Sequence, residues 1–231
     1  IPIPNVLPIY PIKEQIVFPY MVLPVFFDQE TAPIIEEAMR SDQLLGMVYC
    51  PGKKNICTFD EHPRIGTVCK INQLIKFPNG GGKATIEGLS RFALNSPESY
   101  EPCLISSIRV IPEQDSPGVV SEALVQSVNA LMKIALAYGQ PLPDDVINMI
   151  DRIDHPGRLA DMVAVYIGIS LEVQQQLLTI LDPIERLKSV FIHLTNEVQK
   201  MQVKGEIQTE VTKQIGKNQK ETILREQMKQ I

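Results

Sequence analysis

The side chains that could carry catalysis or bind a metal are few and widely spaced in this chain. Its three histidines are His62, His155 and His193, and none has a second histidine four residues away or another metal-ligand spacing. His155 stands before Pro156-Gly157, which indicates a turn, and His193 falls within a long helical pattern. The serine-nucleophile pattern G-x-S-x-G does not occur in the sequence. We therefore expect no catalytic residue, metal or cofactor in this chain.

A run of glycines followed by lysine, Gly80-Gly81-Gly82-Lys83, is similar to part of a phosphate-binding loop. Such a loop needs a glycine five positions before its last glycine, and a serine or threonine after the lysine. Phe77 and Ala84 occupy these positions, and a strand pattern follows where a helix is required. Residues 78–82 are therefore predicted to be the loop of a β-hairpin.

Acidic and thiol side chains give no stronger signal. Asp144 and Asp145 are adjacent, so their side chains diverge on a helix, and we interpret them as first-turn residues that suit the helix dipole. The cysteine spacing includes no C-x-x-C and fits neither a zinc site nor a small disulfide scaffold. Reduced, mostly buried thiols of a cytoplasmic protein are predicted. The four cysteines are Cys50, Cys57, Cys69 and Cys103.

The first half of the chain, residues 1–112, is predicted to be rich in strands. Short apolar runs are punctuated by proline, which is typical of strand starts and edge strands. One helical pattern, Glu30–Arg40, interrupts them, and the residues from Val68 to Phe77 alternate imperfectly, which indicates a bulge. A strongly bent sheet or partial barrel is expected. Its strands are Val6–Ile9, Ile16–Phe18, Met21–Phe27, Leu44–Cys50, Ile65–Phe77, Lys83–Leu94 and Cys103–Ile111.

The second half is predicted to be helical. Residues 113–118 indicate a linker, and residues 119–181 then show the helical period of a small bundle. Residues 182–231 are expected to form one long helix that projects from the bundle. The fold class is therefore α+β. The expected bundle helices are Val119–Tyr138, Asp144–Ile153, Leu159–Ile167 and Leu171–Leu181.

The long helix is the most informative element of the chain. Asp182 to Glu185 carry a strong start signal and no proline follows, so the helix is predicted to run roughly 70–75 Å. Its apolar stripe is dense as far as Met201 and thins beyond it. Gly205 and Gly216 each weaken the distal half by about 1 kcal/mol relative to alanine. We predict that this half needs partner contacts and that the two glycines act as hinges.

Charge is distributed unevenly along the chain. The net charge is −5, yet residues 200–231 hold seven Lys/Arg against four Glu, and the remainder holds 15 basic against 23 acidic residues. An acidic body gives little support to nucleic-acid binding. Six prolines within residues 1–27 argue against an export or membrane helix there, so no membrane contact is expected. The chain begins at Ile1, and we expect its natural N-terminus to be missing.

Several short motifs, each weak alone, span nearly the whole chain. They are Leu7-Pro8-Ile9, Tyr10-Pro11-Ile12, Val17-Phe18-Pro19, Gly66-Thr67-Val68, Glu87-Gly88-Leu89-Ser90-Arg91, Glu185-Arg186-Leu187 and Glu226-Gln227-Met228-Lys229. Together and in this order they resemble the N-terminal region of Lon-type ATP-dependent proteases. The first three resemble the proline-containing strands that open that region, the next two its central hairpin with the E-G-L-x-R signature, and the last two its long helix.

The resemblance implies a PUA-like β subdomain and a helical subdomain, followed by a helix that leads to an AAA+ ATPase module and a Ser-Lys protease module. Neither module is in this sequence, which would end where the ATPase begins. The chain would then be the non-catalytic substrate-recognition and assembly region of an ATP-dependent serine endopeptidase. ATP and Mg²⁺ would bind the missing module. The implied partners are unfolded or damaged proteins and further copies of the chain in a hexamer.

Capture of unfolded chains requires exposed apolar side chains, mobile loops or an open sheet edge. Three successive glycines resist ordering, so the hairpin loop is the preferred mobile contact. The alternative for each apolar candidate is an ordinary core position. The candidates are Tyr20, Met21, Val22, Phe26 and Phe27 near the proline-rich edge, with Phe77 and Pro78 at the hairpin.

Two other functions stay open from the residues alone. The basic tail, residues 200–231, is compatible with weak nucleic-acid contact, which would fall steeply with salt. The chain is also compatible with a stand-alone adaptor that carries the same β domain.

Overall fold

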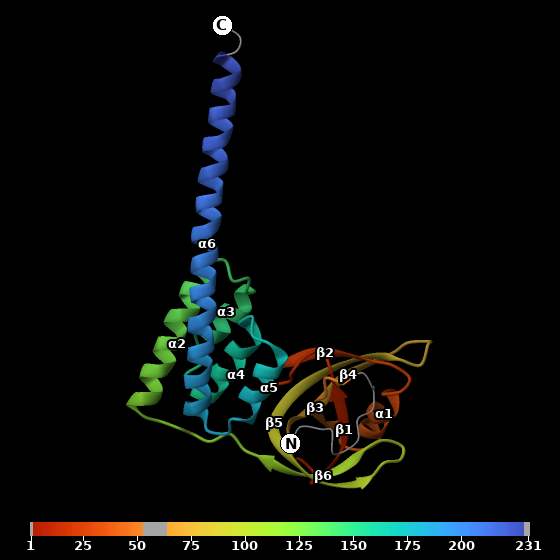
Figure 1. Ribbon diagram of the computed structural model, residues 1–231. Helices are drawn as coiled ribbons and strands as arrows, with labels where there is room; N and C mark the ends of the chain where they lie inside the picture. Colours follow the sequence, from red (N-terminus) through yellow and green to blue (C-terminus); the bar gives the residue numbers. More distant parts are fainter. Residues whose placement is uncertain (1, 53–63, 229–231) are drawn as a thin grey trace.

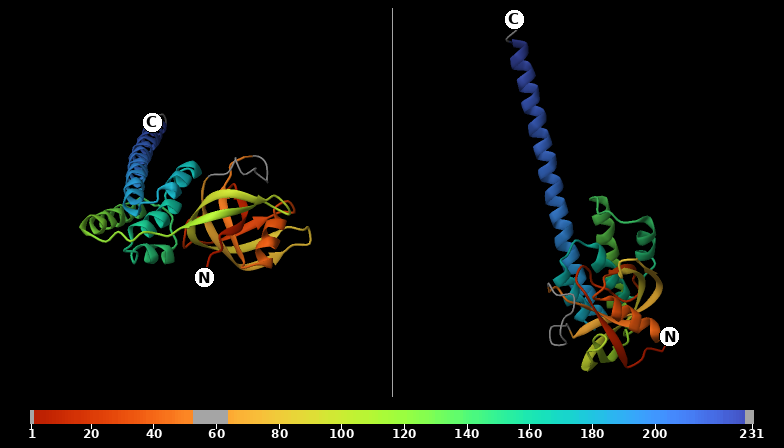
Figure 2. Two further views of the ribbon diagram at one scale, coloured as in Figure 1. Left: turned by 90° about the horizontal axis from the view of Figure 1, so that it is seen from below. Right: turned by 90° about the vertical axis from the view of Figure 1, so that its right-hand side faces the viewer.

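The structure is a computed structural model that describes residues 2–52 and 64–228. A β-barrel unit lies beside a helical bundle, and one long helix rises from the bundle (Figure 1). Figure 2 shows from two further sides that the barrel and the bundle lie next to each other while the distal part of the long helix extends away from both. The α+β prediction is confirmed. His62 and Cys57 lie outside the described residues.

Within residues 2–52 and 64–228, six strands form one strongly curved sheet in the order β2-β5-β4-β3-β1-β6. The long strand β5 pairs with β4 along one edge, and its other edge is shared by β2 near the start and β6 near the end. Since β6 also pairs with β1, the sheet closes there. The strands are β1 (Val6–Ile12), β2 (Val22–Phe27), β3 (Leu44–Tyr49), β4 (Ile65–Lys76), β5 (Gly82–Ser99) and β6 (Ile105–Ile111).

The barrel is closed on one side only. β6 pairs with the first three residues of β1, and β2 pairs with β5 alone. On the edge away from β3, the second half of β1 therefore has no ladder partner among the described residues, and the edge of β2 away from β5 has none either. This open seam makes the architecture a partial barrel, as predicted, and the expected bulge in β4 appears as register shifts at Val68/Cys69 and Ile71/Gln73.

The predicted strand Ile16–Phe18 is wrong. These residues are buried but join no ladder, and Ile16 and Phe18 pack with the helices in the largest apolar core. An apolar run of three residues satisfies a core position as well as it satisfies a strand, so the pattern could not separate the two.

The helices agree closely with the expectation. They are α1 (Ala32–Arg40), α2 (Val119–Ala137), α3 (Asp144–Ile150), α4 (Pro156–Tyr166), α5 (Leu171–Thr179) and α6 (Pro183–Met228). Asp182 caps α6, because its Oδ1 accepts a hydrogen bond from the Glu185 amide at 2.9 Å. The Glu185 carboxylate accepts a hydrogen bond from Lys188 Nζ at 2.7 Å. At about 1.5 Å per residue, the 46 residues of α6 span roughly 70 Å.

Apolar cores connect the barrel to the bundle. Ile16, Phe18 and Tyr49 from the barrel unit share one core with residues of α2 to α6. Helix α2 is long and apolar enough, by length and composition alone, to cross a membrane. Helix α2 packs on α4 and α6 through buried residues, so its length and apolar composition are weak evidence for a membrane span. The buried residues of α2 are Ser121, Val125, Val128, Met132 and Ala135.

Two predictions about polar residues need correction. His155 is the N-cap of α4, not merely a turn residue, since its Nδ1 accepts hydrogen bonds from the amides of Gly157 and Arg158. Cys69 and Cys103 are free and buried, as predicted, but Cys50 is disulfide-bonded. The spacing argument tested only zinc and multi-disulfide patterns, and these do not exclude a single disulfide.

Candidate functional site

Strand β2 carries apolar side chains on both of its faces. Leu23, Val25 and Phe27 point into the barrel core, whereas Val22, Pro24 and Phe26 point outward. A sheet with one solvated face normally places polar residues there. Val22 is 62% exposed and Phe26 is 66% exposed. We call Val22, Pro24 and Phe26 the outer face of β2.

Polar side chains of β5 border the outer face of β2. In the ladder, Val22 lies opposite Glu87 and Phe26 lies opposite Lys83. The Lys83 ammonium lies 5.9 Å from the centroid of the Phe26 ring, at the outer limit of a cation–π contact. The surface therefore has an apolar centre and a charged rim, which is the usual composition of a protein-binding patch.

The hairpin between β4 and β5 brings a second aromatic ring to this surface. Phe77 donates its amide to the Gly81 carbonyl at 2.8 Å, and Gly80 has a φ of 84°, so residues 78–82 form the predicted hairpin loop. Gln29 Nε2 donates to the Asn79 carbonyl at 2.7 Å and ties the loop to the turn after β2. Phe26 and Phe77 consequently line the same pocket, of about 500 Å³.

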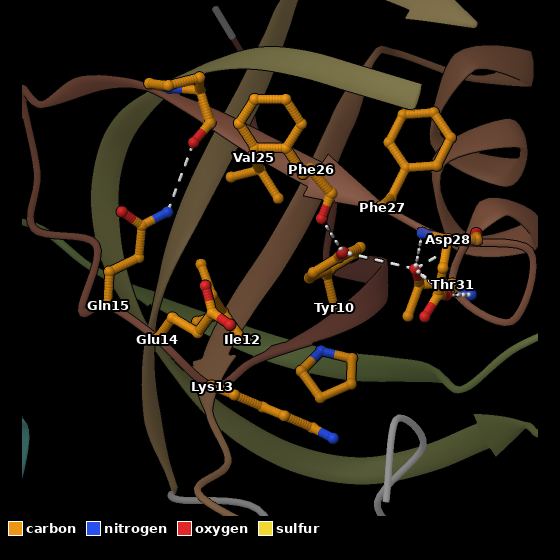
Figure 3. Close-up of a pocket in the computed structure, with 12 residues that line it drawn as sticks. Tyr10, Ile12, Lys13, Glu14, Gln15, Val25, Phe26, Phe27, Asp28 and Thr31 are labelled. Carbon is orange, nitrogen blue, oxygen red and sulfur yellow. Dashed lines mark hydrogen bonds between the residues drawn. The ribbon is translucent and has the colours of Figure 1, made fainter. Parts of the chain in front are cut away.

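A second pocket, of about 570 Å³, occupies the open seam between β1 and β2 (Figure 3). Tyr10 donates its hydroxyl to the Phe26 carbonyl, and Gln15 Nε2 donates to the Pro24 carbonyl, each at 3.5 Å. These bonds are long, so both carbonyls are weakly satisfied. The Tyr10 hydroxyl is protonated at neutral pH and can donate, and burial raises its pKa further above the ordinary value of 10.0. Pro11 and Pro24 line the seam and have no amide hydrogen to offer.

The remaining candidates are mostly turned away from this surface. Phe27 contributes to the lining of both pockets but is 7% exposed, with its side chain in the barrel core, and Met21 is half-buried between two cores. Tyr20 is exposed and has an unusual φ of 67°, but its ring lies 4.0 Å from the Arg158 guanidinium of α4 and therefore faces the bundle. Pro78 is exposed in the hairpin loop. The structure thus brings Phe26 and Phe77 to one pocket, with Val22 on the same face of β2 as Phe26 and Pro78 next to Phe77 in the hairpin loop.

The hinge candidates Gly205 and Gly216 lie within the continuous helix α6. A Cβ atom built at either position meets nothing within 4 Å. Neither backbone conformation nor packing requires glycine at these two positions, so their effect on the helix is that of propensity alone.

Sequence reasoning missed the seam pocket. The free edges of β1 and β2 come from strand pairings that are distant in the chain, and a single sequence does not show them. One signal was present: Pro11 and Pro24 each stand inside a strand, and proline within a strand marks an edge.

An exposed apolar strand with two adjoining pockets is the kind of surface that protein-binding modules use. Among residues 2–52 and 64–228, no group of three His, Cys, Asp or Glu side chains is arranged to hold a metal ion. The two free thiols suit a structural role, because burial raises the pKa of both, that of Cys103 to about 11.

Comparison with known proteins supplies the family. Residues 6–196 match the family model described as the ATP-dependent protease La (LON) substrate-binding domain. The chain is 49% identical over 228 residues to a Lon protease of Citrifermentans bemidjiense, and 33% identical over 231 residues to one of Dictyoglomus thermophilum. Each alignment covers 99% of this chain and 29% of the relative. The chain therefore belongs to the Lon protease family, as its substrate-binding domain, and spans less than a third of the length of these relatives.

Solved structures agree on the fold. The N-terminal domain of a Mycobacterium avium complex Lon protease superimposes with a TM-score of 0.66 at 21% identity, covering 82% of this chain and 98% of that one. A Lon N-terminal domain protein from Xanthomonas campestris gives a TM-score of 0.58 at 15% identity, covering 81% and 97%. The comparisons favour the substrate-recognition function over the nucleic-acid and adaptor alternatives.

Proposed function

We propose that this domain captures exposed apolar segments of unfolded or damaged proteins on the outer face of β2 and on the adjoining hairpin loop. The observation that supports it most directly is the exposure of Val22 and Phe26 on a strand whose other face is barrel core. A folded monomer gains nothing from leaving such side chains in water, and contiguous exposed apolar surface marks interaction sites. Phe77, at the shared pocket, extends the surface toward the loop.

The captured segment binds through side chains and not by adding a continuous strand. Pro24 lies in the middle of the free edge of β2, and Pro11 lines the opposite side of the seam. A peptide paired along β2 would meet no donor at Pro24, so the ladder would be interrupted. Contacts to apolar side chains need no fixed sequence register, which suits a domain that accepts many substrates.

The longer protein supplies the chemistry in this proposal. ATP and Mg²⁺ bind an AAA+ module and a Ser-Lys dyad cleaves the substrate, both beyond the residues of this chain, in a cytoplasmic hexamer. The distal half of α6 contacts neighbouring copies through its exposed aliphatic stripe, and Gly205 and Gly216 let it bend as substrate is passed on. The stripe consists of Val203, Ile207, Val211 and Ile215.

The binding proposal is tested with the variant Val22→Ser/Phe26→Ser. Each serine removes apolar surface that a bound segment would cover, so we expect about a tenfold loss of affinity for a carboxymethylated, permanently unfolded protein. Fluorescence anisotropy measures the affinity, and circular dichroism verifies the fold.

The matched control is Ile192→Ser, which removes a comparably exposed aliphatic side chain from α6. It should bind like the unaltered chain. Equal losses in both variants, or equal binding of the folded and unfolded forms of the probe by the unaltered chain, contradict the proposed site.

A further inference from the structure

A buried cluster of charged side chains joins the barrel to the helical bundle. Arg91 of β5 is 2% exposed and forms a bidentate pair with Asp161 of α4. Its Nη1 donates to Oδ2 at 2.9 Å and its Nη2 donates to Oδ1 at 2.7 Å. Its Nε donates to the carbonyl oxygen of Leu178 in α5 at 2.9 Å. One barrel side chain thus binds two helices of the bundle.

A second arginine enters the cluster from the base of α6. Arg186 is fully buried; its Nη1 donates to the Ile180 carbonyl at 2.7 Å, and its Nη2 donates to Glu113 Oε1. The Nε of Arg186 lies 3.1 Å from Asp161 Oδ1, but the geometry does not form a hydrogen bond. This contact between Arg186 Nε and Asp161 is therefore purely electrostatic. Glu113 Oε2 also accepts a hydrogen bond from Arg91 Nη1 at 3.2 Å. Two cations and two anions therefore balance at one site.

Gly157 makes room for this cluster at the start of α4. A Cβ atom built there collides with Glu113 Oε1 and with Arg186 Nη2. The Glu113 carboxylate can therefore approach the first turn of α4 only because this residue is glycine. Glu113 itself lies two residues after the end of β6, so the segment that enters the bundle is anchored near its start.

A second contact between the barrel and the bundle involves residues near Arg91 in the sequence. Gly88, three residues before Arg91, donates its amide to Met21 and accepts from the Tyr20 amide at 2.7 Å. A Cβ atom at Gly88 would collide with the Phe18 carbonyl. The turn that carries Phe18 and Tyr20 is thereby held against the barrel, and it presents Tyr20 to Arg158 of α4.

The charged cluster selects one orientation of the barrel on the bundle, which the apolar contacts around it do not. Hydrophobic burial is non-directional, so the shared core holds barrel and bundle together without selecting one orientation. A guanidinium–carboxylate fork is planar and accepts a narrow range of geometries. Four such groups, from β5, the segment after β6, α4 and α6, cannot all stay paired if the barrel rotates on the bundle. An unpaired charge left behind in this site would be costly.

We propose that Arg91, Glu113, Asp161 and Arg186 are positioning residues that set the direction of α6 relative to the barrel. Arg91 ends the motif Glu87-Gly88-Leu89-Ser90-Arg91 and Arg186 is central to Glu185-Arg186-Leu187, so two motifs far apart in sequence serve one junction. The inference is independent of the substrate-binding proposal, because none of the four residues lines either pocket beside β2.

The test measures orientation separately from stability. Spin labels are attached through bio-orthogonal residues at Asn95 of β5 and Gln208 of α6, both exposed, and the distance distribution is recorded by pulsed electron spin resonance. In Asp161→Asn we expect this distribution to become roughly twofold broader, because the fork to Arg91 loses its charge. Label pairs within the barrel (Gln73 with Asn95) and within the bundle (Gln126 with Gln208) should keep their widths.

The control is Glu185→Gln, which removes the exposed ion pair with Lys188 next to Arg186 and should leave all three distributions unchanged. If Asp161→Asn does not fold, the double variant Arg91→Met/Asp161→Leu is measured, which keeps the Glu113–Arg186 pair and the charge balance. An unchanged Asn95–Gln208 width together with a lower melting temperature, in whichever variant folds, would show that the cluster contributes stability only and would overturn the proposal.

Discussion

The two ends of the barrel unit use the same kind of residue in opposite ways. At the end that meets the bundle, Phe18 is completely buried in the core shared with the helices. At the free end, Phe26 is 66% exposed on the outer face of β2. Both belong to short apolar runs beside a proline, Val17-Phe18-Pro19 and Pro24-Val25-Phe26. The difference teaches that composition selects which residues are apolar, whereas the neighbouring element decides which of them is left for a partner.

The largest expected effect separates the two phenylalanines. Phe18→Ala should lower the free energy of unfolding by about 3–5 kcal/mol, because it opens a cavity between barrel and bundle. Phe26→Ala should change it by less than about 0.5 kcal/mol, because the ring is largely in water already. Urea denaturation followed by circular dichroism measures both. Similar losses for the two variants would break the comparison.

The secondary structure was largely predictable because local chemistry determines it. Asp182 starts α6, the glycines of residues 80–82 form a turn, and the apolar period changes from two to helical after residue 118. Alternation on an apolar strand leaves one set of side chains outside but does not say which one, and the candidates included residues of both sets: Val22 and Phe26 lie outside, whereas Phe27 lies in the core. The proposed unit boundaries at residues 112 and 118 stay predictions.

Contacts between distant residues were not predictable. Arg91, Asp161 and Arg186 look like ordinary surface charges when each is examined in its own segment, and only the fold makes them a buried cluster. The one local signal is Arg186 four residues before the fully buried Val190, a spacing that places both on the same face of the helix. No local pattern predicts that Arg186 shares a cluster with Arg91 of β5, which lies 95 positions earlier.

Gly88 and Gly205 allow a second comparison between the barrel–bundle junction and an exposed surface. Gly88→Ala should destabilise the chain by about 1–3 kcal/mol, because the new Cβ collides with the Phe18 carbonyl. Gly205→Ala should stabilise α6 by up to about 1 kcal/mol, because nothing surrounds the added methyl group and alanine favours the helix. Thermal unfolding of the two variants should therefore shift in opposite directions. A stabilising Gly88→Ala would show that the turn at residues 18–21 adapts freely.

The smallest expected effect concerns the barrel interior at alkaline pH. Burial, with a smaller contribution from Glu37, raises the pKa of Cys103 to about 11 from 9.0. Above the unfolded value the unfolded chain releases a proton that the folded chain keeps, so stability falls as pH rises from about 9 to about 11. By pH 9.5 the loss should be below about 1 kcal/mol.

The measurement is the free energy of unfolding at pH 8.0 and 9.5 for the unaltered chain and for Cys103→Ala. The alanine variant should lose less stability over this interval, because it has no thiol to ionise. Identical losses would mean that Cys103 is more accessible to water than its place in the barrel core indicates.

Pro24 has a consequence if the outer face of β2 binds unfolded chains, as proposed above. A free strand edge next to an exposed apolar surface is a template on which bound segments could stack as cross-β fibrils. With no amide hydrogen at its centre, the edge of β2 cannot propagate such a stack. In the proposed function, captured chains would therefore meet an edge that does not template their stacking.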